Sequence, residues 1–555
     1  MRRDTTRRQK TIAALAASAV SFGIVGLAFL TPSRSYAIPA FARKYGTSCT
    51  TCHLDFPLLN DFGKAFKDAG FKFPTDDASM LKQPPVMLGA EAQKMAFPNA
   101  VWPGEIPGNV PVGLRMNNFF QVTSSNRNKF NALTPPGSTP QFVPGTDFET
   151  GLFSLFTAGN FGGDIAYWVD DDISVGGDNA AGGLGDGYFR FVDLSRLMKM
   201  PKDSVYVRIG QFELDLPYTQ ARTINISPYD IYNESNIGAM TPFAAQQNVV
   251  NQVNMATPAR GVEVSGGHLY GGYHYSVAVF DQSSNGVAQS ANMNPYVPSA
   301  TGAASDGVGF ASDTTTKDIF ARFSYRFNLE RDPAVRHEIQ AAGSTGPRDH
   351  TYLTLGGFYM HGDSNMPLAL PMQQVSPTYL NATAPFYRVG GNISFNYRNF
   401  YIYGLYMFAR DDNPLPVTSN GALVPLPLAA DSLTPTGFIY GMPVDFDGGF
   451  VEANYLVKPW IMLIGRWDSV NSTADRINGL ALSTDSPFFA PYASTRNRYT
   501  PGIQFLLRAN IKFSVEYQIR PLESITFVTN PQTGLIKATN PFRVNTLVMA
   551  TEFVF

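Results

Sequence analysis

The only two cysteines of this 555-residue chain lie in one pentapeptide, Cys49-Thr50-Thr51-Cys52-His53. The C-x-x-C-H spacing is typical of c-type haem attachment, in which two thiols bind the porphyrin and the adjacent imidazole ligates the iron. A structural disulfide, a redox-active thiol pair and a zinc site are the alternatives. Zinc would require two further ligands nearby, and a redox pair usually begins a helix in a βαβ unit. We therefore expect one covalently attached haem c on Cys49 and Cys52, with His53 as the proximal iron ligand.

The second axial ligand of the iron is less well defined by the sequence. The next histidine after His53 is His268, so a bis-histidine site within the N-terminal segment is excluded. Met87 ends the stiff stretch Lys82-Gln83-Pro84-Pro85-Val86-Met87, and a methionine ligand would raise the haem potential. We take Met87 as the first candidate distal ligand and Met80 as the second. An ordinary packing role for both, an open site and a ligand from the rest of the chain are the alternatives.

The residues after the motif predict a helix over 57–70. Pro57 suits the first turn of a helix and Gly70 its C-terminal end. One face of this helix would be apolar, because its apolar residues recur at intervals of three and four. They are Leu58, Leu59, Phe62, Ala65, Phe66 and Ala69. We expect this face to pack against the porphyrin, together with Phe41, Tyr45 and Phe56.

The first 37 residues have the layout of a secretory signal peptide. A basic leader precedes the apolar run 11–30, and the segment ends in the small-x-small pattern Ser35-Tyr36-Ala37. An uncleaved membrane anchor is the alternative. Cleavage after Ala37 would leave 36 basic and 43 acidic residues from the 42 and 44 of the whole chain. This net charge of about −7 disfavours a nucleic-acid partner, which would need a basic surface.

From about residue 110 onward the apolar residues alternate with polar ones. Ile511, Phe513 and Val515, for example, alternate with Lys512, Ser514 and Glu516, as in half-buried strands. Sixteen strands are predicted, near 112–123, 150–158, 163–170, 186–193, 203–211, 260–267, 272–280, 317–327, 351–361, 386–396, 399–409, 447–456, 459–468, 498–507, 510–519 and 545–555. Most have about the length of a membrane-spanning strand.

The connections between these strands alternate in length. Turns such as 397–398 are short, whereas the next connections, such as 212–259, are long and are expected to be solvated loops. Short turns on one side and long loops on the other are typical of outer-membrane barrels, although 328–350 is an exception. An even strand count would place both barrel ends on the periplasmic side. The last strand alternates up to a final phenylalanine, Phe555, as outer-membrane barrels do.

Composition agrees with such a barrel. Charged residues make up 15% of the chain and aromatic residues 13%, whereas disordered chains are charged and poor in aromatic residues. A helical membrane protein would need several apolar runs of about 20 residues, and only the N-terminal run has this length. The predicted fold class is therefore all-β, a 16-stranded antiparallel outer-membrane barrel with a small α-helical N-terminal module.

The chain resembles the fused monohaem cytochrome–porin family of outer-membrane proteins, whose best-known members serve iron-oxidising bacteria. The resemblance rests on 38–48 (IPAFARKYGTS) before Cys49, on 58–63 (LLNDFG) and on 100–108 (AVWPGEIPG); the barrel half matches only in pattern. It implies a signal peptide at 1–37, a monohaem cytochrome c-like module and linker at 38–110 and a porin-like barrel at 111–555. It also implies haem on Cys49, Cys52 and His53 and electron transfer across the outer membrane.

Three classes of function follow from this organisation: an electron conduit, a transport porin and an electron-exporting outer-membrane reductase. The first is an electron conduit between an extracellular donor, such as Fe(II), and a periplasmic carrier such as a soluble cytochrome or copper protein. This would make the protein an Fe(II)-oxidising cytochrome, unless electrons are exported in the opposite direction. The second is a transport porin with a haem-bearing plug or redox gate. We expect the module to plug the barrel from the periplasmic side, within a solvated wall of inward-facing residues. These residues are Arg115, Arg208, Arg322, Arg326, Lys512 and Glu516.

Overall fold

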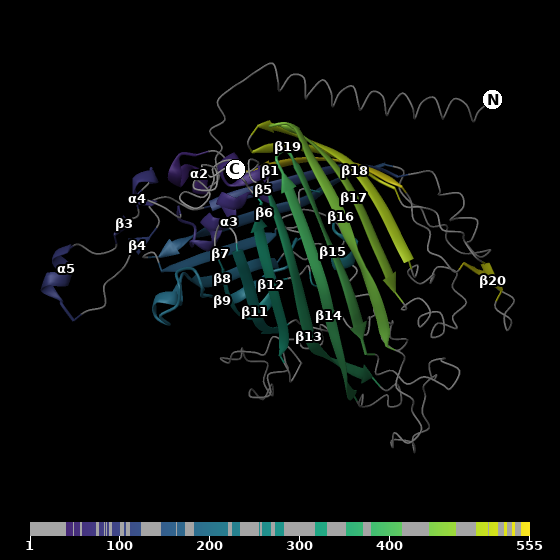
Figure 1. Cartoon of the computed structure of the whole chain (residues 1–555), viewed down its shortest axis with the longest axis horizontal. Helices are drawn as coiled ribbons and strands as arrows, with labels where there is room; N and C mark the ends of the chain where they lie inside the picture. Colours follow the sequence, from purple (N-terminus) through teal and green to yellow (C-terminus); the bar gives the residue numbers. More distant parts are fainter. Residues whose placement is uncertain are drawn as a thin grey trace, which may run out of the picture.

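A closed barrel of sixteen antiparallel strands forms most of the molecule in this computed structural model (Figure 1). The structure describes residues 40–47, 49–55, 58–73, 77–82, 84, 86–87, 91–99, 105–106, 112–123, 146–161, 164–172, 183–219, 225–233, 255, 258–267, 272–281, 317–329, 351–369, 379–412, 443–472, 495–508, 510–519, 527–529, 536–538 and 545–554. The expected signal peptide, Phe56, Pro57 and Phe555 lie outside these residues.

Each barrel strand pairs with its neighbours in the chain, and the last strand, β22, closes the barrel on the first, β5. The strands are β5 (Val112–Thr123), β6 (Thr146–Phe161), β7 (Ile165–Asp172), β8 (Gly183–Phe191), β9 (Tyr206–Phe212), β10 (Ala259–Gly267), β11 (Gly272–Asp281), β12 (Asp318–Asn328), β13 (Tyr352–Ala369), β14 (Tyr379–Tyr397), β15 (Phe400–Asp411), β16 (Val444–Lys458), β17 (Ile461–Ser472), β18 (Thr495–Arg508), β19 (Ile511–Gln518) and β22 (Thr546–Val554). All sixteen predicted strands and the antiparallel barrel are therefore confirmed.

The alternation along the strands separates an apolar exterior from a more polar interior. Many large apolar side chains on the outer face are exposed; Ile209, Val264, Phe323, Val389, Phe408 and Trp467, for example, are between 37% and 56% exposed. The intervening side chains point inward and are mostly buried. A closed barrel satisfies every strand's backbone and covers its outside with apolar groups, which is what a bilayer requires.

The two ends of the barrel differ in their connections. At one end, here called the short-turn end, tight turns join β14 to β15, β16 to β17 and β18 to β19. At the opposite end most residues of the predicted long loops lie outside the described residues, although part of 520–544 forms a hairpin of β20 (Phe527–Thr529) and β21 (Ile536–Ala538). The predicted exception, 328–350, also lies almost wholly outside the described residues.

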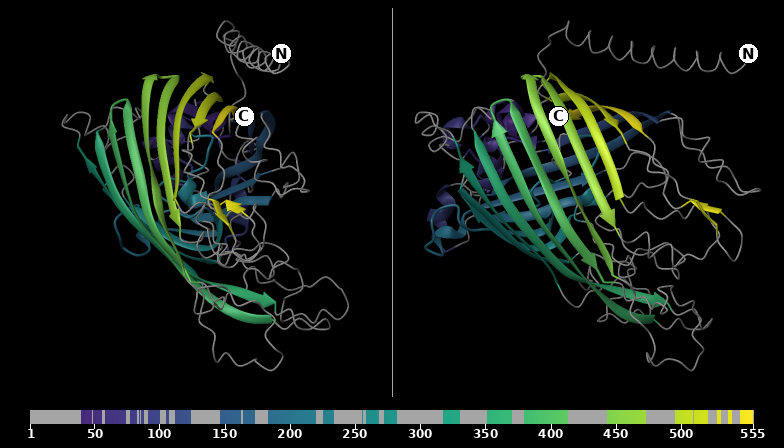
Figure 2. Two further views of the ribbon diagram at one scale, coloured as in Figure 1. Left: turned by 90° about the vertical axis from the view of Figure 1, so that its right-hand side faces the viewer. Right: turned by 45° about the vertical axis from the view of Figure 1, so that its right-hand side comes forward.

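The N-terminal segment contains short helices and short strands. They are α2 (Ala40–Tyr45), the 3-10 turn η1 (Cys49–Thr51), β1 (His53–Asp55), β2 (Leu58–Leu59), α3 (Asp61–Asp68), α4 (Asp77–Met80), β3 (Val86–Met87), α5 (Glu91–Ala96) and β4 (Glu105–Ile106). Helices α2 and α3 lie near the barrel end where the chain terminates, as Figure 2 shows in purple. Among the described residues, no helix is long and apolar enough to span a membrane, a finding that does not bear on strands.

The predicted helix over 57–70 is correct at its end and wrong at its start. Helix α3 begins at Asp61, because Asn60 caps it by accepting a hydrogen bond from the Gly63 backbone. Leu58 and Leu59 pair instead with β1. Gly70 follows the helix with a φ of 71°, the left-handed conformation that glycine adopts most readily at a helix end.

Candidate haem-attachment site and barrel lumen

The two cysteines and the histidine of the C-x-x-C-H motif share one tight turn. Cys49 begins η1, and the Cys52 backbone N–H donates to the Cys49 carbonyl at 3.1 Å. His53 follows directly as the first residue of β1, opposite Leu59 of β2. Both thiols are free rather than joined in a disulfide. The turn therefore presents two free thiols and one imidazole within five residues, the donor set that covalent haem attachment uses.

Asn60 ties this turn to helix α3. Its side-chain amide donates to the Thr51 carbonyl at 2.9 Å, and its backbone N–H donates to the Cys52 carbonyl at 2.9 Å. Its side-chain oxygen accepts from the Gly63 backbone at 2.7 Å. The helix approaches so closely that a Cβ at Gly63 would lie 2.0 Å from the Cys52 carbonyl oxygen. Only glycine permits this approach, so residues 60–63 fix the position of the motif.

Burial affects the chemistry of both thiols. It raises the pKa of the Cys49 thiol, and burial together with the neighbouring Cys49 raises the pKa of the Cys52 thiol to about 12. A reactive redox pair or a zinc site uses thiolates, which form easily only when the pKa is low. Among the described residues, no cluster of three or more Cys, His, Asp or Glu could hold a metal ion. The raised pKa values thus disfavour the thiolate form of both cysteines, which a reactive redox pair would use.

An aromatic cluster lies beside the motif. Its members are Phe41, Tyr45, Phe62, Phe66, Phe71 and Phe73, and the partly buried Cys52 packs against it. The Phe41 and Phe71 rings stack with centroids 5.0 Å apart. The Tyr45 hydroxyl donates to Asp77 at 2.7 Å. The predicted apolar face thus contributes Phe62, Ala65 and Phe66 to a wall that keeps water from one side of the motif.

The N-terminal segment is docked inside the short-turn end of the barrel. Gly70 lies against Val192 and the inward-facing Ala166, and its carbonyl accepts a hydrogen bond from Asn160 of β6 at 3.1 Å. Asp68 forms an ion pair with Arg190 of β8 at 3.1 Å.

On the other side of the lumen, Leu58 packs against Leu456, Met462 and Ile464 of β16 and β17. The segment therefore contacts two walls that are separated by about half of the barrel circumference.

The two candidate distal ligands lie in different elements. Met80 ends helix α4, and its side chain is 48% exposed. Met87 lies in β3 opposite Glu105 of β4, and its side chain is outside the described part of the chain. The choice between the two methionines stays a prediction.

The connection after β9 was expected to be a solvated loop, and this is wrong for the part that the structure describes. Residues 213–219 and 225–232 enter the barrel, where their apolar side chains join the inward-facing side chains of the strands in one buried cluster. The buried contributors from this segment, here called the lumen segment, are Leu214, Leu216, Tyr229, Ile231 and Tyr232. The Tyr229 ring stacks on Phe450 with centroids 3.9 Å apart.

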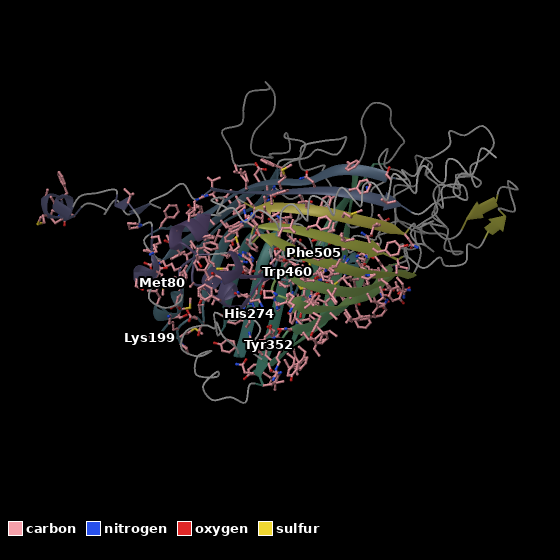
Figure 3. All side chains as sticks on the ribbon, turned by 90° about the horizontal axis from the view of Figure 1, so that it is seen from above. Met80, Lys199, His274, Tyr352, Trp460 and Phe505 are labelled. Carbon is pink, nitrogen blue, oxygen red and sulfur yellow. The ribbon has the colours of Figure 1, made fainter. Side chains whose placement is uncertain are left out.

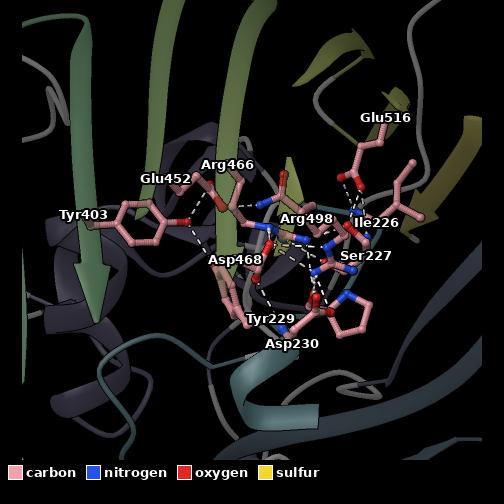
Figure 4. Close-up of polar contacts among 12 residues, drawn as sticks. Ile226, Ser227, Tyr229, Asp230, Tyr403, Glu452, Arg466, Asp468, Arg498 and Glu516 are labelled. Carbon is pink, nitrogen blue, oxygen red and sulfur yellow. Dashed lines mark hydrogen bonds and ion pairs between the residues drawn. The ribbon is translucent and has the colours of Figure 1, made fainter. Parts of the chain in front are cut away.

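Charged side chains from four strands hold the lumen segment in place (Figure 4). Arg466 donates to the Ser227 carbonyl at 2.9 Å and to Asp468 at 2.7 Å. Arg498 pairs with Asp230 of the lumen segment at 3.0 Å.

Two carboxylates complete this attachment. Glu516 accepts hydrogen bonds from the backbone of Ile226 and from the Ser227 hydroxyl. Glu452 accepts from the Tyr403 hydroxyl at 2.6 Å and from Asn225. The arginines and carboxylates of this network are at most 5% exposed. Together they form a dry polar clamp rather than a water-filled channel wall.

The six wall residues named from the sequence lie in the lumen, but the expected solvation is wrong for Arg208, Lys512 and Glu516, which are at most 6% exposed. Arg115 and Lys512 both pair with Glu552, at 2.5 and 2.7 Å, Arg208 pairs with Glu263 at 2.6 Å, and Glu516 holds the lumen segment. Arg322 pairs with Asp215, and Arg326 lies 3.6 Å from the centroid of the Tyr352 ring. The alternation along a strand identifies its inward face but cannot show which inward-facing charged side chains form ion pairs with each other.

Asp215 anchors the beginning of the lumen segment to β11 and β12. Its carboxylate lies 2.6 Å from His274 Nε2 and 3.1 Å from Arg322 Nη1. Burial by itself would raise the pKa of this carboxyl, but the Arg322 guanidinium and His274 outweigh it and hold the pKa well below its usual range. The anchor is therefore ionised at neutral pH.

Comparisons with known proteins find similarity only among solved structures. No protein-family model and no curated protein matches the chain. An anion-selective porin from Comamonas acidovorans is 11% identical with a TM-score of 0.42, over 80% of this chain and 98% of that one. OmpT from Vibrio cholerae in its trimer form is 11% identical with a TM-score of 0.39, over 80% and 98%. Salmonella typhi OmpF in complex with daunomycin is 10% identical with a TM-score of 0.39, over 80% and 97%.

Proposed function

We propose that this protein is an outer-membrane electron conduit that carries one haem c on Cys49 and Cys52, with His53 as the proximal ligand. Electrons would pass from an extracellular donor, such as Fe(II), to a periplasmic carrier such as a soluble cytochrome or copper protein. One observation carries the proposal: the segment with the C-x-x-C-H motif lies inside the short-turn end of the barrel, between opposite walls. A soluble cytochrome domain that was merely tethered to a porin would not need to occupy the lumen.

The thickness of the membrane explains why the position of the motif inside the barrel matters. The hydrocarbon layer is about 30 Å thick, so one haem can link its two sides only from within the barrel. Bound haem supplies a one-electron carrier whose potential depends on its ligands and on its exposure to water. The chain's own residues provide the rest: Asn60 and Gly63 fix the motif turn, and the aromatic cluster around Phe66 limits the access of water.

The state of the lumen favours a conduit over an open pore. Sixteen-stranded porins leave an aqueous channel, and inward-facing side chains in such a channel are wetted. Here Arg388, Arg466, Asp468 and Arg498 are at most 3% exposed. A transport porin is the second candidate, because a barrel of this size has room for solutes if the lumen segment and the N-terminal segment move.

The proposed location follows from the same architecture. Signal-directed export of residues 38–555 would deliver the chain to the periplasm, and the apolar exterior requires a membrane. Because the strand number is even, both barrel ends lie on the short-turn side, which is the periplasmic side of outer-membrane barrels. The haem would then face the periplasmic carrier, and the long-loop end would face the extracellular donor.

The experiment that tests the proposal is spectroscopic. Purified full-length protein should show a reduced c-type haem spectrum within seconds to minutes after addition of Fe(II), and His53→Ala should lose the low-spin spectrum. A spectrum that survives His53→Ala would refute the ligand assignment. A stable haem that Fe(II) does not reduce would exclude iron as the donor but leave the conduit intact.

Conductance separates the second candidate from the first. In planar bilayers we expect small or no ion currents from the intact protein, because both the lumen segment and the N-terminal segment occupy the barrel. Large steady pores that do not depend on the haem redox state would instead identify a transport porin.

A further inference from the structure

The connection between β8 and β9, residues 192–205, is the longest turn that the structure describes in full at the short-turn end. Its base is closed by Ser195, whose hydroxyl oxygen accepts the backbone N–H groups of Ser204 and Val205, both at 2.9 Å. The turn contains the 3-10 helix η2 (Leu194–Arg196). The turn is therefore an ordered structural element that extends beyond the ends of β8 and β9.

Backbone strain in this turn supports a fixed shape. Asp193, Lys199 and Asp203 have φ values of 51°, 56° and 65°, which residues other than glycine rarely adopt. Such conformations persist only where the surrounding structure imposes them. The Asp193 carboxylate provides one such restraint, because it accepts the Asp203 backbone N–H at 3.1 Å.

The tip of the turn is apolar and basic. Leu197, Met198 and Met200 are 82%, 58% and 45% exposed. Lys199 and Lys202 lie among them and are exposed. A patch of large apolar side chains on a soluble face usually marks a site of interaction, and flexible methionines are common on such surfaces. The two lysines select a partner with negative charge.

The turn is continuous with the segment that carries the motif. Val192, where the turn begins, packs in the same cluster as Cys52 and touches Gly70. Arg190, two residues earlier, pairs with Asp68 of α3. Figure 3 shows Lys199 and the half-exposed Met80 at the same end of the molecule, away from the yellow β20–β21 hairpin. A protein seated on this turn would therefore lie next to the haem-bearing segment.

We propose that residues 197–202 are the docking surface for the periplasmic electron carrier, a soluble redox protein whose cofactor edge is surrounded by acidic residues. The inference rests on the proposed function and names its partner's chemistry. An apolar centre with basic neighbours suits a short-lived complex, because opposite charges speed encounter while a small contact allows rapid release. The outward-facing positions of β8 end at Phe191, six residues before Leu197, so the tip of the turn lies beyond the end of this strand.

The test uses plastocyanin, a copper protein with an acidic patch, and full-length haem-loaded protein. Lys199→Glu with Lys202→Glu should lower the rate of electron transfer at low ionic strength by about tenfold or more, as expected when charge steering is reversed. The same variant should weaken binding of redox-inert zinc-substituted plastocyanin, and salt should reduce the difference. The matched control is Arg398→Glu with Lys458→Glu, which makes the same charge change on exposed turns of the opposite wall. It should change the rate less than twofold.

A second variant tests the apolar part of the surface. Leu197→Ser, Met198→Ser and Met200→Ser together should slow transfer without removing its salt dependence. Unchanged rates and binding in both variants, with haem fully loaded, would overturn the docking proposal alone. Unchanged transfer with weaker retention on anionic phospholipid vesicles would show that the turn binds lipid headgroups instead. Absence of covalent haem from the wild-type protein would overturn the proposed function itself.

Discussion

Gly63→Ala tests whether helix α3 fixes the haem-attachment turn. A Cβ at this position would lie 2.0 Å from the Cys52 carbonyl oxygen and 3.0 Å from Leu59 Cδ2. Real contacts of this kind stay at or above 3.0 Å, so the helix and the turn must separate by about 1 Å. This movement would stretch both 2.9 Å hydrogen bonds from Asn60 to the turn.

The expected cost follows from these contacts. Each hydrogen bond contributes about 1 kcal/mol net, and a weakened N-cap costs about 1 kcal/mol more. Alanine recovers up to about 1 kcal/mol relative to glycine within a helix. We therefore expect the N-terminal segment to lose about 1–2 kcal/mol of stability, while the barrel, which makes none of these contacts, keeps its own.

The assay compares covalent haem content and thermal loss of the haem absorbance in the full-length protein. Gly465→Ala in β17 is the matched control, because a Cβ there has nothing within 4 Å. Gly63→Ala should lower haem content or the haem melting temperature, and Gly465→Ala should change neither. Equal behaviour of the two variants would refute the idea that the close approach at Gly63 positions the motif.

Three further predictions concern the lumen and the distal ligand. Arg466→Ala should destabilise the barrel by about 3 kcal/mol, near the lower end for a broken buried ion pair because Arg498 still contacts the Asp468 carboxylate; heat-induced unfolding in detergent measures this, and an unchanged midpoint would contradict it. Asp215 has a lowered pKa, so its anchoring contribution should persist from pH 7 to about pH 4; Arg322→Ala leaves burial less opposed, so the unfolding midpoint of this variant in detergent should begin to fall at a higher pH than that of the wild type, whereas identical pH profiles would count against the anchor. Substituting Met87 should remove the low-spin spectrum if it is the distal ligand, and Met80 is tested in the same way; two unaffected spectra would exclude both methionines.

The strands could be predicted from the sequence because each faces two different environments. Because lipid lies on one side and the lumen on the other, apolar and polar residues alternate along each strand, and this alternation is visible in the sequence. The same logic explains the largest error, at the hairpin of β13 and β14. Their pairing continues from Gly362 to Ala369, opposite Phe386 to Tyr379, beyond the predicted ends at 361 and 386. Backbone pairing between the two strands holds this extension together. A hairpin that does not face lipid does not need to alternate apolar and polar side chains, so the sequence pattern did not reveal it.

The lumen segment could not be predicted by the same rule. Residues 213–219 and 225–232 lie inside the barrel and face no lipid, and their position in the long connection 212–259 indicated a loop. A weaker signal was present, because Leu214, Leu216 and Tyr218 continue the apolar alternation of β9 beyond its end at Phe212, which a solvated loop would not need. Arg466 and Glu516, the strand residues that hold Ser227, lie more than 200 residues away in the chain. Such pairings depend on the closure of the barrel and leave no local pattern.

Strand β17 shows how the N-terminal segment and the lumen segment, which together fill the lumen, lie relative to each other. Its inward side chains are, in order, Met462, Ile464, Arg466 and Asp468. The first two pack against the N-terminal segment, and the next two hold the lumen segment. Successive inward positions on a strand are only about 7 Å apart, so one filling begins where the other ends. Because no stretch of this wall is left between them, release of either one alone would still leave the barrel obstructed.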